Sequence, residues 1–158
     1  MDKILTLENG SLISLSNWLG RQAIPGMKSR ERTRFLAAIR ENLLEVDKFR
    51  LELVKEHADV DEKGEFVMNE DPMGRKNFEL SDENRKLVED GFDKKLSETY
   101  SLAITPEIEK SYEFVKNLVV NTPTEFSGKE AEEFDKWCSA FESDSKKVSE
   151  KDTAEKGE

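Results

Sequence analysis

The chain of 158 residues has little of the chemistry that most enzymes use: it contains one cysteine and one histidine. A single cysteine excludes an internal disulfide and is compatible with a reducing compartment. Glycine-rich phosphate loops, nucleophile elbows and paired-cysteine motifs are also missing. We therefore expect a protein that is not an enzyme and that uses no cofactor.

The sequence also lacks the features of a secreted or membrane protein. No run of 18 apolar residues occurs, so no membrane-spanning helix is predicted. The first residues do not have the charged, apolar and small-residue layout of a signal peptide. From these patterns we expect a chain that works in a cytoplasm and does not bind membranes.

The two residues with reactive side chains are each better explained by packing or by solvation than by catalysis. His57 falls near the end of a predicted helix, where a partly charged imidazole suits the helix dipole. Cys138 shares an apolar helix face with Trp137 and Phe141, which is typical of an inert buried thiol. Neither residue has a partner in a recognisable catalytic pattern.

Charged residues make up 38% of the chain and hydrophobic residues only 35%, a balance that favours elongated amphipathic helices over a thick sheet. The net charge of −10 argues against a general nucleic-acid coat, because such a protein would repel the phosphate backbone. Residues 21–50 are the exception, since they contain eight basic and four acidic side chains, a net charge of +4.

The spacing of apolar residues predicts a helix-dominated α+β fold. A long amphipathic helix is expected over about 29–58, about 45 Å at 1.5 Å per residue, a length typical of a bundle or an oligomer seam. Shorter helices are expected after the N-cap residues Ser11, Ser81 and Ser127 and after Pro106. Short strands are predicted at the ranges 4–7, 64–68, 76–80 and 99–105.

Composition separates the chain into two parts. Residues 1–142 contain the periodic apolar segments and are predicted to form a single α+β domain. Residues 143–158 contain Val148 and Ala154 as their only apolar residues, too few to offset the entropy of ordering. We therefore expect a disordered, charged tail.

Residues 59–70, "DVDEKGEFVMNE", resemble a calcium loop. Asp59, Asp61, Gly64 and Glu70 occupy positions 1, 3, 6 and 12 of the EF-hand pattern. Position 5, however, is Lys63, and an ammonium 4 Å from a cation is repelled by roughly 4 kcal/mol per unit charge at an effective dielectric of 20. We interpret the segment as an acidic turn in which Gly64 supplies a positive φ, and we expect no metal site.

The most unusual feature is a basic cluster at the start of the long helix, where the macrodipole favours acidic residues. We regard its arginines as the candidate partner- or anion-binding residues: Arg30, Arg32, Arg34 and Arg40.

Three explanations for this cluster remain open. The arginines are solvated or paired with the chain's own acids, such as Glu130, Glu132 and Glu133; or they bind a protein partner; or they bind nucleic acid. The third is the least favoured, because no aromatic residues that could stack on bases are interleaved with the arginines.

Four segments resemble a family of small proteins encoded by tailed phages of Gram-positive bacteria. They are an opening Leu-x-Asn-Gly at Leu7, the basic "RERTRF" that begins at Arg30, the turn "DEKG" that begins at Asp61, and "FSGKEAEEFDKWCSAFE" over 126–142. The resemblance covers about residues 4–142. Because the family has no established activity, it implies only a context: a product in the host bacterial cytoplasm or in the virion.

Two classes of function fit these observations. The first is a non-catalytic interaction protein that is a structural or assembly component of the phage particle; the second is an early phage protein that inhibits a host enzyme or defence system. In both, the partner is a protein of the phage or the host, and self-association is compatible with the long helix. A nucleic-acid-binding accessory protein that uses the basic helix is a third alternative.

Overall fold

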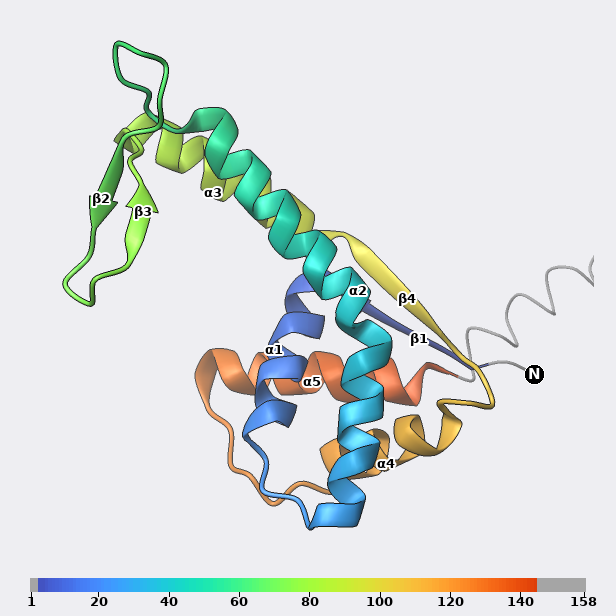
Figure 1. The fold of residues 1–158 in the computed structure, drawn as a ribbon. Helices are drawn as coiled ribbons and strands as arrows, with labels where there is room; N and C mark the ends of the chain where they lie inside the picture. The colour runs from blue at the N-terminus through green and yellow to red at the C-terminus, as the bar shows by residue number, and fades with distance from the viewer. Residues whose placement is uncertain (1–2, 145–158) are drawn as a thin grey trace, which may run out of the picture. The chain divides into compact units, whose positions relative to one another are not determined.

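The computed structural model describes residues 3–144 and contains five helices and four short strands, which confirms the expected helix-dominated α+β fold (Figure 1). The long helix, α2, is present over Gly26–His57, within a few residues of the predicted limits. The order of elements is β1 (Lys3–Glu8), α1 (Asn9–Arg21), α2 (Gly26–His57), β2 (Met68–Glu70), β3 (Lys76–Phe78), α3 (Asp82–Ser97), β4 (Thr99–Ile104), α4 (Glu109–Val120) and α5 (Gly128–Glu142).

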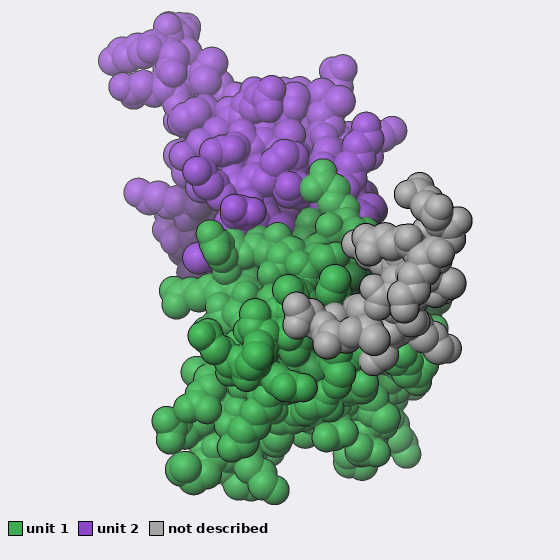
Figure 2. Space-filling view, turned by 90° about the vertical axis from the view of Figure 1, so that its right-hand side faces the viewer, with its two compact units in different colours: residues 1–43, 98–158 green, residues 44–97 purple. Residues whose placement is uncertain are grey.

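The chain divides into two compact units, coloured separately in Figure 2. Unit 1 comprises residues 1–43 and 98–158, and unit 2 comprises residues 44–97. The boundary therefore falls within α2, which contributes to both units. Of the predicted charged tail, 143–158, all but the first two residues lie outside the described part of the chain.

Unit 1 contains a two-stranded antiparallel sheet made of β1 and β4. The strands pair over six positions, from Lys3 opposite Ile104 to Glu8 opposite Thr99. Leu5 and Leu7 are buried, while their neighbours along β1 are at least partly exposed, so the strand predicted at 4–7 is confirmed and its side chains alternate between two faces.

The prediction that Ser11 is the N-cap of the first helix was wrong. Helix α1 begins directly at Asn9, with Glu8 as its N-cap, so Ser11 lies inside the helix and is not the cap. The backbone N–H of Asn9 donates to the carbonyl of Glu98 at 2.9 Å and extends the ladder between β1 and β4. The Asn9 side chain also accepts a bond of 2.8 Å from the Asn42 amide. These contacts hold Asn9 at the first turn of a helix.

The hydrophobic core of unit 1 draws on β1, β4 and all its helices, α1, α4, α5 and the first part of α2 (Figure 1). Burial of this apolar surface is the main stabilising contribution in a unit of this kind. Its fully buried side chains are Leu5, Leu12, Leu15, Leu19, Phe35, Ile39, Tyr112, Val115, Val119 and Phe141.

An aromatic cluster connects α1 with α5. Trp18 and Trp137 lie with ring centroids 5.8 Å apart, and Phe126 stacks on Phe134 at 4.6 Å. The indole N–H of Trp137 donates to the Ser11 carbonyl at 3.1 Å. These aromatic residues are therefore packing residues of the core, as the apolar stripe of the last helix predicted.

Unit 2 has a much smaller core. Val46 and Val88 are its buried apolar residues. Seven of its large hydrophobic side chains are instead exposed: Leu44, Leu51, Val60, Phe66, Met68, Met73 and Leu87. Unit 2 therefore leaves much of its apolar side-chain surface exposed.

Two similar tight turns shape the loop region of unit 2. In each, an aspartate side chain accepts two backbone N–H bonds: Asp61 from Lys63 and Glu65, and Asp71 from Met73 and Arg75. Each turn ends on a glycine in the left-handed region, with φ of 78° at Gly64 and 79° at Gly74. The predicted turn with positive φ at Gly64 is confirmed.

The start of α3 also follows the prediction. The Ser81 hydroxyl accepts a bond of 3.2 Å from the backbone N–H of Asn84, the third residue of the helix. Ser81 is thus the N-cap residue and satisfies one of the free N–H groups of the first turn.

Tyr112 and Asp144 form a buried polar pair in unit 1. Tyr112, from α4, donates its hydroxyl hydrogen bond to Asp144, which is only 1% exposed and also pairs with Lys116 at 3.3 Å. Burial, followed by the bond to Asp144, raises the pKa of Tyr112 above its ordinary value. The phenol therefore stays protonated and remains a donor to the carboxylate.

We predict that Tyr112→Phe lowers the free energy of unfolding by about 1–3 kcal/mol, because it removes a donor from a buried carboxylate. Below pH about 10 the raised pKa of Tyr112 contributes stability, which is lost as the pH rises through the folded-state pKa. The difference between wild type and variant should therefore narrow above pH about 10. Urea unfolding followed by tryptophan fluorescence measures this, since both tryptophans lie in unit 1. Equal stability at pH 7 would contradict it.

Candidate functional site

The structure gives the four candidate arginines different roles. The Arg32 guanidinium turns back to the end of α1 and donates hydrogen bonds to the carbonyls of Leu19, at 3.1 Å, and Gln22. The negative end of the α1 dipole lies there, where a cation is stabilising. Arg32 thus stabilises the fold, which explains one positive charge at the start of α2.

Arg30 and Arg34 instead line a hollow of about 500 Å³ between the start of α2 and the start of α4. We call this the basic hollow. Its lining residues are Met27, Lys28, Arg30, Glu31, Arg34, Lys110 and Phe114.

Glu31 is the acidic member of the basic hollow and is only 8% exposed. The hydroxyl of Ser111 donates to its carboxylate at 2.7 Å, and Arg34 and Lys110 approach it at 3.3 and 3.7 Å. The hydrogen bond from Ser111, followed by the nearby cations, lowers the pKa of Glu31 below its ordinary value. This residue therefore stays ionised and holds α2 against α4.

Four cations surround this single carboxylate, which leaves the basic hollow with a net charge of +3. Lys28 and Arg30 form no hydrogen bond or ion pair with any residue in the described range 3–144. Arg34 and Lys110 remain 53% and 84% exposed while they pair with Glu31. The basic hollow can therefore accept an external anion without first breaking a buried ion pair.

Arg40 is exposed and is not among the lining residues of the basic hollow. The acids that the sequence suggested as partners for the arginines are also not among the lining residues: Glu133 accepts bonds from Ser14 at 2.9 Å and from Lys136 at 3.4 Å.

The contributions of Lys110 and Phe114 to the basic hollow could not be predicted from the sequence. Helix α4 lies about 80 residues beyond the start of α2, and the tertiary fold brings the two together.

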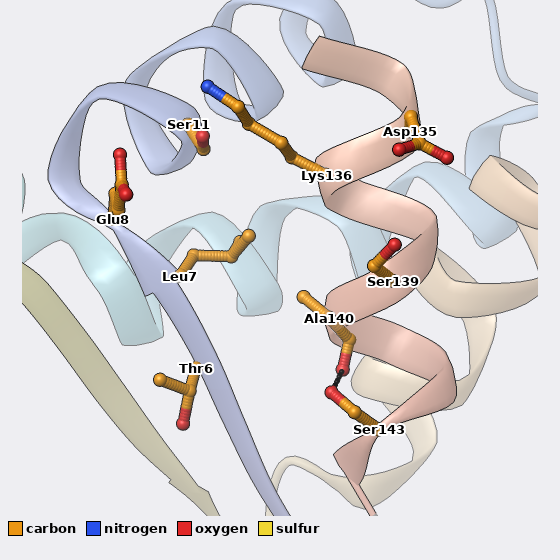
Figure 3. A pocket seen from close by; sticks show the side chains of 9 residues that line it. All are labelled: Thr6, Leu7, Glu8, Ser11, Asp135, Lys136, Ser139, Ala140 and Ser143. Carbon is orange, nitrogen blue, oxygen red and sulfur yellow. Dashed lines mark hydrogen bonds between the residues drawn. The ribbon is translucent and has the colours of Figure 1, made fainter. Parts of the chain in front are cut away.

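A second hollow, of about 300 Å³, lies beside β1 and the start of α1 and is bordered by α5 (Figure 3). Figure 3 shows the Lys136 side chain extending from α5 towards Ser11, with Glu8 on the same side of the hollow. Glu8 and Asp135 are the acids that line it, and the rest of the lining is mainly hydroxyl and apolar groups. Because its charges are of mixed sign and do not converge, it offers no clear anion or metal chemistry.

Two residues of the segment that resembles a calcium loop, Asp61 and Gly64, form a tight turn. One carboxylate oxygen of Asp61 is occupied by two backbone N–H groups, at 2.8 and 3.0 Å. Asp59 and Glu70 lie on extended segments on either side of this turn. Within residues 3–144, no three acidic, histidine or cysteine side chains are grouped so that they could hold a metal ion.

The single cysteine is partly buried on α5. Burial, together with the charges of Glu142 and Asp135, raises the pKa of the Cys138 thiol. A thiol with a raised pKa is a poor nucleophile at neutral pH, since the thiolate is the reactive form.

Comparisons with known proteins gave no match: no protein-family model fits the chain, and no curated protein and no solved structure is significantly similar to it. Each helix in residues 3–144 is either too short or too polar to cross a lipid bilayer. Any functional assignment therefore depends on the site geometry.

We predict that Arg32→Ala destabilises unit 1 by about 1.5–3 kcal/mol, because it removes charged hydrogen bonds to the last carbonyls of α1. Arg40→Ala is the matched control, since it removes the same charge from an exposed position and should change stability by less than about 0.5 kcal/mol. Urea unfolding followed by tryptophan fluorescence compares the two. Equal effects of the two substitutions would contradict the role of Arg32.

A second prediction concerns the carboxylate in the basic hollow. The folded-state pKa of Glu31 is lowered, so its contribution to stability is present above its unfolded pKa and is lost as the pH falls through the folded pKa. Ser111→Ala removes the main cause, and we expect the pKa of Glu31 to rise towards its ordinary value. Carboxyl NMR titration measures this directly, and an unchanged pKa would show that the Ser111 hydroxyl does not stabilise the carboxylate.

Proposed function

We propose that this protein is a non-catalytic interaction protein that binds an acidic segment of another protein in the basic hollow. One observation carries the proposal: four cations line one hollow, and two of them, Lys28 and Arg30, form no hydrogen bond or ion pair within residues 3–144. Clustered like charges repel one another, and the cluster is stabilised when an anionic partner joins it.

The lining supports a protein partner over a nucleic acid. Met27 is 75% exposed at the basic hollow, and Phe114 adds an aromatic surface to it. Nucleic-acid grooves instead follow the backbone with a track of cations and offer several stacking rings. The net charge of −10 also repels a long polyanion, whereas a short acidic peptide needs only the local field of the basic hollow.

The biological setting that we propose follows from the resemblance to tailed-phage proteins. In that setting the chain acts in the host bacterial cytoplasm or in the virion, as an assembly or structural component. The seven exposed large apolar side chains of unit 2 support a role in protein contacts, because burial of apolar surface drives most protein association. Mass spectrometry of purified particles and of cleared lysate separates a virion component from a cytoplasmic one.

We predict that the double reversal Arg30→Glu/Arg34→Glu weakens partner binding by at least about tenfold, or about 1.4 kcal/mol. The measurement is affinity capture from infected cells with wild-type and variant protein, followed by titration of the captured protein. Binding by the wild type should weaken as the salt concentration rises, because exposed charges are screened.

Arg40→Glu is the control, because it reverses an exposed charge on the same helix outside the basic hollow. Arg32 is left intact, since it holds the end of α1. The proposal is overturned if the double variant captures the same protein with unchanged affinity, or if Arg40→Glu weakens binding equally. If the wild type and Arg40→Glu bind duplex DNA and the double variant does not, a nucleic-acid partner is favoured instead.

A further inference from the structure

The exposed segment 59–71 of unit 2 carries a strong negative charge. It contains six carboxylates and one lysine, a net charge of −5. We call it the acidic arm. The carboxylates of Glu62, Glu65 and Glu70 form no hydrogen bond or ion pair within residues 3–144, so they are available to an external cation.

The acidic arm also presents apolar side chains. Val60, Phe66 and Met68 are 56%, 44% and 43% exposed. The basic hollow combines the same two kinds of surface with the opposite charge, since Met27 and Phe114 lie among its cations. A segment that is acidic and apolar is the complement that the basic hollow requires.

The acidic arm is ordered before it meets any partner. Asp61 accepts two backbone N–H bonds across its turn, and Phe66 packs edge-on against Phe78 with ring centroids 5.2 Å apart. The backbone also pairs between Asp59 and Val67. A pre-ordered segment loses little conformational entropy on binding, so its charge contacts contribute more to affinity.

We infer that the basic hollow of one copy binds the acidic arm of a second copy of this chain, with Glu62 and Glu65 facing Arg30 and Lys28. The inference rests on the proposed function and goes further, since it identifies the acidic partner as the chain itself. Charge complementarity carries it: the two surfaces have net charges of +3 and −5, and each includes charged groups that are unpaired in residues 3–144.

Such a contact joins two different surfaces. Made once between two copies it is heterologous and leaves one arm and one hollow free, so further copies can add until a ring closes or a filament grows; made reciprocally it closes a symmetric dimer. A chain that assembles in this way would suit a structural or assembly component.

The test uses two variants that neutralise one surface each: Arg30→Gln/Arg34→Gln in the basic hollow and Glu62→Gln/Glu65→Gln in the acidic arm. Sedimentation velocity of the full chain at low salt should show concentration-dependent association of the wild type and at least a tenfold loss of association in each variant. A mixture of the two variants retains one intact hollow and one intact arm. It should form a 1:1 complex that does not grow further.

Arg40→Gln and Glu79→Gln are the matched controls, because each neutralises an exposed charge outside the two surfaces and should associate like the wild type. The inference is overturned if the wild type remains monomeric at every concentration, or if the variant mixture does not form the 1:1 complex. A third outcome separates this inference from the proposed function. If the wild type is monomeric, but captures a partner protein that the Arg30→Glu/Arg34→Glu variant does not capture, only this inference is overturned.

Discussion

The pairing of β1 with β4 is the constraint on which unit 1 depends. It joins two segments about 95 residues apart over six paired positions, and it continues into the bond from Asn9 to Glu98. Helix α1 follows β1 without a loop, and α4 follows β4 after one short turn, so the sheet positions the starts of both helices. The hydrogen bond from Ser111 to Glu31 then holds the start of α4 against α2. The basic hollow exists because of these two links.

Most of the secondary structure could be predicted because its signals are local. Apolar spacing located α2 to within a few residues, Ser81 marked the start of α3, and alternation marked β1 and β4. The signal failed at the start of α1, which begins at Asn9, two residues before the predicted N-cap Ser11, and is held there by bonds from Asn9 to Glu98 and Asn42. Those partners are distant in sequence, so local propensity could not reveal them. The same reason hid Lys110 and Phe114, which reach the basic hollow only through the tertiary fold.

The arginines show why charge placement in a sequence identifies a region and does not assign roles within it. A cation at the start of a helix opposes the dipole of its own helix. Arg32 resolves this conflict because the negative end of a different helix, α1, lies beside it. Arg34 resolves it through Glu31, which lies one turn earlier on the same helix. Arg30 forms no hydrogen bond or ion pair within residues 3–144 and acts on the Glu31 carboxylate through its charge.

The two units differ in how far their own packing accounts for their stability. Unit 1 buries a contiguous core that includes aromatic residues, whereas unit 2, of about 50 residues, buries mainly Val46 and Val88. A small unit with so little buried apolar surface has a low free energy of unfolding. Any partner that binds its folded form raises that free energy in proportion to the logarithm of the partner's free concentration, once this exceeds the dissociation constant. Contacts made by unit 2 would therefore stabilise the unit as well as recruit the partner. In the self-association that we propose, burial of part of this exposed apolar surface would stabilise the folded form of unit 2.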